Sequence, residues 1–175
     1  VLALQTITSR NMDPQKSLVV SVTQFHAGEA FNIIPDEIIL RGTCRVLDPQ
    51  IQETLPERLE RIVDGVASTF GAKAELVYHK GYPATVNSEQ ASEFCAEVAK
   101  EIAGSNEAVD LKPAPSMGAE DFSYMLQKKP GCYIWTGNGD TAGLHHPEYD
   151  FNDETIAVGA SYWARLVEKR LPKSP

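Results

Sequence analysis

The sequence has no long apolar run and no concentration of basic residues, and each absence excludes a class of protein. No stretch approaches the roughly 20 apolar residues that a membrane-spanning helix requires, and no signal-peptide pattern is present. Sixteen Lys and Arg stand against 24 Asp and Glu, which gives a formal net charge of -8. A nucleic-acid backbone would therefore find no cluster of cations to bind. We expect a soluble, cytoplasmic protein that binds neither membranes nor nucleic acid.

Cysteine is also scarce. The three cysteines, Cys44, Cys95 and Cys132, are widely spaced and odd in number, which favours reduced, buried thiols over a disulfide framework or a thiolate metal site. Hydrophobic residues make up 42% of the 175 residues, enough to bury a core in one domain or in two small ones. The chain begins without Met, in a pattern typical of the tail of a helix, so we expect a piece of a longer protein.

The first half of the sequence alternates between helical and strand patterns. The predicted elements are a helix tail at 1–11, strands at 17–25, 37–48 and 73–83, and a long helix that starts with the capping Asp48 and Pro49 and ends at Gly71. This order is that of a ferredoxin-like βαββαβ unit without its first strand. We expect such an α+β unit to occupy residues 1–83.

The second half has the pattern of three helices and one short strand. The predicted elements are a helix capped by Ser88 that runs to Gly104, a short helix from about Asp121, a short strand at 132–139 and a final amphipathic helix at 152–171. The final helix has acidic residues in its first turn and basic residues in its last, which matches the helix dipole.

Two adjacent histidines, His145 and His146, follow a Gly-rich turn in the stretch GLHHPEYDFNDE. A loop between a predicted strand and a predicted helix is where a rigid scaffold can present a metal ligand. The same pattern also fits a polar loop in which one histidine packs and the other is solvated. One histidine cannot hold a metal alone, so local chemistry leaves both interpretations open.

Four short motifs occur in order along the chain: Asn-x-x-Pro-Asp from Asn32, Gly-Thr-x-Arg ending at Arg45, Gly-Ala-Glu-Asp-Phe from Gly118 and Leu-His-x-Pro around His145. Each is weak alone. Together they closely resemble the C-terminal part of the N-acyl-amino-acid amidohydrolases, the hippurate-hydrolase and indoleacetyl-amino-acid-hydrolase branch of the aminoacylase and carboxypeptidase-type dinuclear metallohydrolases. The resemblance covers nearly the whole sequence.

The resemblance implies an α/β protein in two parts. Residues 1–83 would be a ferredoxin-like lid and dimerisation domain, through which we expect a homodimer, and residues 84–175 the C-terminal segment of the metallohydrolase catalytic domain. The complete site would hold two divalent metals, zinc or manganese, which activate a water and polarise an amide carbonyl. His145 matches the one metal ligand in this chain. The general base and the other ligands are expected upstream, so no catalytic residue is assigned here.

The resemblance also implies substrate-binding residues for an N-acyl amino acid. The guanidinium of Arg45 would bind the substrate carboxylate and the amide of Asn32 an oxygen, because a hairpin could bring the two side chains together. Gly118 and Glu120 would line the pocket, whereas Asp121 is better explained as a helix cap. The alternative is a non-catalytic lid-type dimerisation or binding module.

Overall fold

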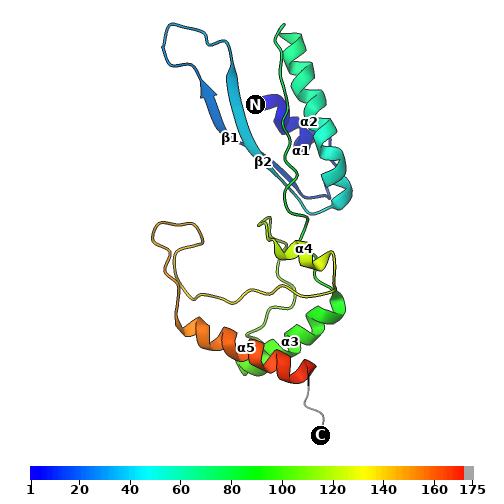
Figure 1. The fold of residues 1–175 in the computed structure, drawn as a ribbon, viewed down its shortest axis with the longest axis vertical. Coiled ribbons are helices and arrows are strands. Elements are labelled where there is room, and N and C mark those ends of the chain that lie inside the picture. The colour runs from blue at the N-terminus through cyan, green and yellow to red at the C-terminus, as the bar shows by residue number, and fades with distance from the viewer. Residues whose placement is uncertain (172–175) are drawn as a thin grey trace. The chain divides into compact units, whose positions relative to one another are not determined.

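The computed structural model describes residues 1–171, and the chain divides into two compact units. The first unit is Val1–Ala84 with Met117–Glu120, and the second is Thr85–Ser116 with the residues from Asp121 onward (Figure 1). The expected combination of helices and sheet is confirmed. Within residues 1–171 no helix is both long enough and apolar enough to cross a membrane.

The first unit contains two helices and an antiparallel hairpin. Its elements in order are α1 (Leu2–Arg10), β1 (Leu18–Ala27), β2 (Ile38–Val46) and α2 (Pro49–Thr69). The hairpin register is irregular at a bulge near Thr23, and a bulge bends a strand and increases its twist. These elements correspond to the predicted order of helix, strand, strand and helix.

The core of the first unit lies where both helices meet the hairpin. Its buried side chains are Ile7 of α1, Val20 of β1, and Leu55 and Leu59 of α2. The positions on α2 are four residues apart, so they lie on one face of the helix. Leu55 is fully buried, whereas Phe70, which continues the apolar pattern of α2, is 82% exposed.

The predicted start of α2 is confirmed by its capping. The Asp48 carboxylate accepts hydrogen bonds from the backbone N–H groups of Gln50, at 2.8 Å, and Ile51, at 3.4 Å. Pro49 takes the first helical position, where its missing N–H is not needed. Lys16 also forms an ion pair with Asp48, and this hydrogen bond together with the backbone bonds holds the pKa of Asp48 below its usual value.

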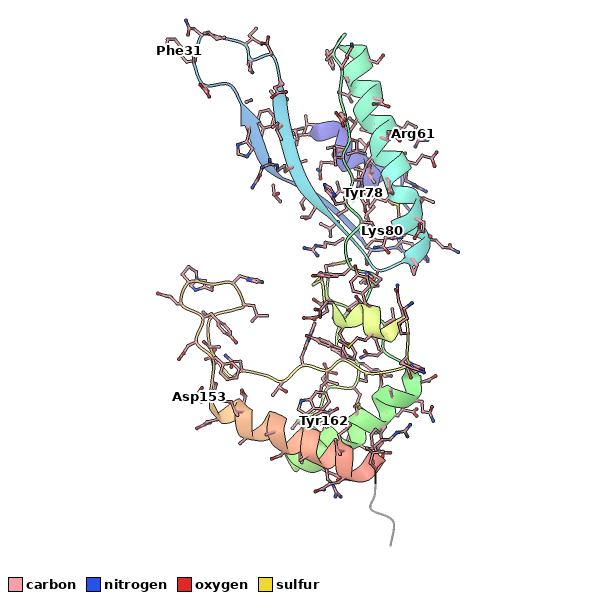
Figure 2. The ribbon with its side chains drawn as sticks, viewed as in Figure 1. Phe31, Arg61, Tyr78, Lys80, Asp153 and Tyr162 are labelled. Atoms are coloured by element: carbon pink, nitrogen blue, oxygen red, sulfur yellow. The ribbon has the colours of Figure 1, made fainter. Side chains whose placement is uncertain are left out.

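The strand predicted at 73–83 is wrong. These residues carry no strand in the structure, although Leu76 and Tyr78 pack against the core of α1 and α2 as their apolar pattern suggests (Figure 2). Two side chains of α2 contact this segment. The Gln52 side chain donates to the Tyr82 carbonyl at 3.3 Å, and Glu53 forms an ion pair with Lys80. A strand needs a neighbouring backbone to pair with, and a sequence pattern does not supply one.

The second unit is built around two packed helices. Its elements are α3 (Glu89–Ala103), α4 (Phe122–Leu126) and α5 (Glu154–Arg170). Cys95 and Val98 of α3 bury against Tyr162 of α5, whose place on α5 is visible in Figure 2. Burial raises the pKa of the Tyr162 hydroxyl. Arg165 pairs with Glu101 across the same two helices at 2.9 Å.

The predicted bounds of α3 are confirmed by both of its caps. The Ser88 hydroxyl accepts a hydrogen bond from the backbone of Ala91 at 3.3 Å, which satisfies one of the free N–H groups of the first turn. Gly104 ends the helix in the left-handed conformation, with φ 67°, where a glycine has no steric penalty.

The short strand predicted at 132–139 is also wrong, and no strand occurs over the described residues of the second unit. The backbone there pairs with a side chain instead. The Asn87 amide donates to the Tyr133 carbonyl and accepts from the Tyr133 N–H, both at 2.8 Å. The Ser88 N–H donates to the Gly131 carbonyl at 2.9 Å. The segment is thus attached to the start of α3 without a β-ladder.

Candidate functional site

The histidine loop comprises residues 139–151 and is closed at its base by the side chain of Asn138, with a weaker contribution from Thr141. The Asn138 amide donates to the Asp150 carbonyl at 2.7 Å, and its oxygen accepts from the Asn152 N–H at 2.8 Å. Thr141 adds a longer bond of 3.5 Å to the same Asp150 carbonyl. The two residues on either side of the loop are therefore joined directly, as in the compact surface loops that frequently carry function.

The base of the loop is continuous with the start of α5. The Asn152 side chain accepts from the Glu154 N–H at 3.0 Å, and the Asn152 carbonyl accepts from the Thr155 N–H at 3.0 Å. Asp153, at the helix start in Figure 2, makes no side-chain capping bond within residues 1–171. Asn152 is therefore the effective cap of α5, and it ties the loop to a helix that packs in the core.

His145 has an unusual backbone conformation. It has φ 68° and is the one non-glycine residue of residues 1–171 with positive φ. This conformation costs an L-residue roughly 1–2 kcal/mol, and such strain persists where the surroundings impose it. His145 lies in the first of two consecutive turns. In the first turn the His146 N–H donates to the Gly143 carbonyl at 3.1 Å, and in the second the Tyr149 N–H donates to the His146 carbonyl at 3.0 Å. The left-handed conformation of His145 allows the chain to change direction through these two turns.

The two histidine rings are in different situations. The Nδ1 atom of His146 accepts a hydrogen bond from the Glu148 N–H at 3.1 Å. If His146 bound a metal through Nε2, its ring proton would lie on Nδ1. The Nδ1–H group and the Glu148 N–H would then be two donors facing each other, and this hydrogen bond would be lost. The exposed His145 ring has no hydrogen bond to any other described residue. Of the two rings, that of His145 is the better placed to bind a metal.

A complete metal site is not formed by these residues. In the part of the chain that the structure describes, no three His, Cys, Asp or Glu side chains are grouped so that they could hold a metal ion. Structural and catalytic metal sites use at least three protein ligands in most cases. The residues present therefore do not fit a dinuclear metal centre by themselves, and His145 is a single donor.

The hairpin does not bring Asn32 and Arg45 together, which corrects the expectation from sequence. Ala27 lies opposite Ile38 at the loop end of the hairpin, and Val19 lies opposite Arg45 near its other end. Asn32 belongs to the connection after Ala27, near the exposed Phe31 at its tip (Figure 2). Seven residues of strand at roughly 3.3 Å each put Arg45 about 23 Å from the loop end.

Arg45 is half-buried on β2, and among residues 1–171 no carboxylate forms an ion pair with it. Its guanidinium is therefore not committed to the surface ion pair that was the alternative explanation. Asn32 is exposed. The roles of both side chains toward a substrate stay predictions.

Gly118 and Glu120 lie in the segment Met117–Glu120, which clusters with the first unit, whereas His145 belongs to the second. Asp121 occupies the start of α4, as predicted, but its carboxylate makes no capping bond within the described chain. The capping role expected for Asp121 is therefore wrong. Its backbone has helical dihedral angles, φ -72° and ψ -19°, whereas a capping residue usually has an extended conformation that lets its side chain reach back.

Sequence reasoning missed the three asparagines that organise the second unit, Asn87, Asn138 and Asn152. The signal available for Asn138 was its Asn-Gly pair, which predicts a turn. Gly139 has positive φ and the chain bends at Asp140 and Thr141, but the Asn138 amide makes its two hydrogen bonds to residues 12 and 14 positions away. Local patterns carry no information on partners so distant.

Comparison with known proteins identifies related sequences of greater length. A hippurate hydrolase of Campylobacter jejuni is 37% identical over 171 residues, which cover 98% of this chain and 44% of the relative. An N-acetylcysteine deacetylase of Bacillus subtilis is 31% identical over 166 residues, which cover 95% of this chain and 43% of the relative. The chain thus spans less than half the length of these relatives.

Solved structures share the fold. One is described as a dinuclear metal binding peptidase from the M20 family of Bacillus subtilis, with a TM-score of 0.74 and 29% identity over 99% of this chain and 46% of that one. A protein from methicillin resistant Staphylococcus aureus has a TM-score of 0.76 and 28% identity over 95% of this chain and 42% of that one. The model of peptidase family M20/M25/M40 matches residues 6–169, and the chain belongs to this family.

Proposed function

We propose that this chain forms the C-terminal part of an enzyme that hydrolyses the amide bond of N-acyl or aryl-acyl amino acids. Family membership supports amide hydrolysis in general, and relatives named for hippurate and N-acetylcysteine support the acyl amino acid class. The observation that carries the proposal is His145, whose ring is exposed and has no hydrogen bond to other described residues. A loop closed at its base presents this ring at the position of the family motif.

In this proposal His145 supplies one ligand to a site of two divalent metals, zinc or manganese. The similarity to a structure described as a dinuclear metal binding peptidase supports two metals, and a site of mixed nitrogen and oxygen donors favours zinc or manganese. The remaining ligands and the general base would come from a part of the enzyme outside this sequence, because the described residues do not form a metal site of their own.

We assign the substrate carboxylate to Arg45, since a guanidinium binds a carboxylate through two parallel hydrogen bonds. Asn32 would bind an amide oxygen, and Gly118 and Glu120 would line the pocket. The hairpin register places Asn32 and Arg45 too far apart to reach one small substrate from a single chain. We therefore propose that one active site uses Arg45 and Asn32 from different protomers.

The second protomer would be supplied by a homodimer that forms through the first unit. Of the described strands, β1 pairs only with β2, in a two-stranded sheet. A strand with an unpaired edge offers a row of N–H and C=O groups to another chain, and identical chains most often assemble about a two-fold axis. The competing proposal is a non-catalytic dimerisation module. It shares this interface but gives His145 no role as a metal ligand.

The two histidines provide a matched test of the catalytic proposal. In a protein of full family length that carries this sequence, we expect His145→Asn to lower kcat by about 100-fold or more, because it removes a metal ligand while asparagine tolerates the left-handed conformation. His146→Asn should change kcat little, since its side-chain oxygen can accept the Glu148 N–H. Kinetics on N-acyl amino acids and metal content by mass spectrometry are measured for both. Equal effects of the two substitutions would contradict the assignment.

Arg45→Ala tests the carboxylate contact. In the same full-length protein we expect kcat/KM on an N-acyl amino acid to fall by the equivalent of roughly 2–4 kcal/mol, since a charge-assisted pair is lost. The control is Arg41→Ala, which removes the same side chain four residues earlier on β2 and should leave the kinetics unchanged. A substrate amide without the carboxylate should be insensitive to Arg45→Ala. If Arg45→Ala does not change kcat/KM, Arg45 is not in the site.

The dimer is tested by sedimentation velocity of the 175-residue chain across a concentration series. We expect a dimer at micromolar concentrations, because the unpaired edge of β1 is present in this chain alone. A single monomeric species at high micromolar concentration would remove this interface and, with it, the proposed sharing of Asn32 and Arg45 between protomers.

Metal analysis tests whether this chain holds a site without further ligands. After dialysis against a chelator and exposure to zinc or manganese, the purified 175-residue chain should retain no stoichiometric metal, because one imidazole binds a divalent ion too weakly. The His145→Asn chain is the matched control. Stoichiometric metal that is lost in the control would show that the chain completes a site by itself, against the proposal.

A further inference from the structure

We propose that Asn138 is the positioning residue of the histidine loop, and that its side-chain amide places His145 relative to α5. This inference rests on the proposed function, because positioning matters to the reaction only if His145 takes part in it. The structural claim can be examined without any assay of activity.

The Asn138 amide makes two hydrogen bonds to the chain that returns from the loop. Its nitrogen donates to the Asp150 carbonyl and its oxygen accepts from the Asn152 N–H, at 2.7 and 2.8 Å. The chain returning from the loop therefore presents one acceptor and one donor to a single planar group. An amide satisfies both at once, and no other side chain of the same size and shape does so. A carboxylate in its place would still accept from the Asn152 N–H. Its second oxygen, however, would lie against the Asp150 carbonyl oxygen, and two acceptors cannot form a hydrogen bond.

The Asn138 amide is linked to His145 through the base of the loop. Residues 139–151 are joined at their base to Asn152, and Asn152 caps α5, a helix that is fixed by burial of Tyr162 against α3. Without the Asn138 bonds, the one remaining bond across the base among residues 1–171 would be that from Thr141 to the Asp150 carbonyl, at 3.5 Å. Loop closure costs entropy that grows with loop length. The two short Asn138 bonds therefore supply most of the hydrogen bonding that offsets this entropy at the base of the loop.

The backbone of His145 is in the left-handed conformation. The conformation with φ 68° is unfavourable for histidine, so it must be imposed by the surrounding turns and by the fixed ends of the loop. Release of the base would let the chain relax from this conformation. The His145 ring would then lose its fixed direction, although the residue itself is unchanged.

Two other asparagines provide controls with the same substitution. Asn87 makes the same pair of amide bonds, at 2.8 Å each, but to Tyr133 rather than to the histidine loop. Asn152 uses only its side-chain oxygen, which accepts from Glu154, and its amide nitrogen has no partner within residues 1–171. An aspartate therefore preserves the hydrogen bond at Asn152 and removes one at Asn87 and at Asn138.

The experiment compares Asn138→Asp, Asn87→Asp and Asn152→Asp in the 175-residue chain by amide hydrogen exchange and ¹⁵N relaxation. We expect Asn138→Asp to speed exchange in residues 139–151 by about tenfold or more and to lower their order parameters, with α3 and α5 unaffected. Asn87→Asp should loosen only the residues around Tyr133, and Asn152→Asp should leave the loop ordered. If Asn138→Asp does not fold, Asn138→Ser takes its place under the same criteria.

An unchanged histidine loop in Asn138→Asp, or equal loosening of that loop in Asn87→Asp, would overturn the proposal.

The kinetic experiment uses a protein of full family length. In it, Asn138→Asp should lower kcat about 10–100-fold with little change in KM, and Asn87→Asp should not lower kcat. If His145→Asn abolishes activity and Asn138→Asp does not reduce kcat, the positioning role is wrong. If His145→Asn has no effect, the proposed function fails, and loop order alone decides the claim for Asn138.

Discussion

Hydrogen bonding of backbone groups by side-chain amides is the constraint on which the second unit depends. Backbone N–H and C=O groups are strong hydrogen-bonding groups that take partners in a folded chain, and over its described residues this unit has no strand to provide them. Asn87 and Asn138 each supply a donor and an acceptor to one returning segment. Both attach irregular chain to the start of a helix, α3 or α5, and those helices are held together by Cys95, Val98 and Tyr162. The loops are therefore only as well placed as these amides and this small core allow.

The helices could be predicted from the sequence because their signals are local. Asp48 with Pro49, and Ser88 with Gly104, mark helix ends through contacts within a few residues of themselves, and the structure contains each of these contacts. The two mistaken strands show the opposite case. Their apolar patterns correctly indicated chain that packs on a core, as Leu76 and Tyr78 do. A strand, however, is a relation between two backbones, and periodicity in one segment cannot show whether a partner lies beside it.

The same distinction applies to the candidate site. The type and motif of His145 could be read from the sequence, and so could the turn around it. The positive φ of His145 and the bond from Glu148 to the His146 ring could not be, because both follow from how the turns close. Asn32 and Arg45 were expected to meet because few residues separate them. In an antiparallel hairpin, proximity depends on register instead, and the register places them near opposite ends.

The predicted site residues are divided between the two units, and each unit holds its own residues in a different way. Asn32, Arg45, Gly118 and Glu120 belong to the first unit, and His145 belongs to the second. A side chain that is loosely held within its own unit loses more conformational entropy when it binds a substrate or an ion than one that is already held in place. The β1–β2 ladder holds the backbone of Arg45, whereas the loop that contains His145 is held at its base by the Asn138 amide and by the cap of α5.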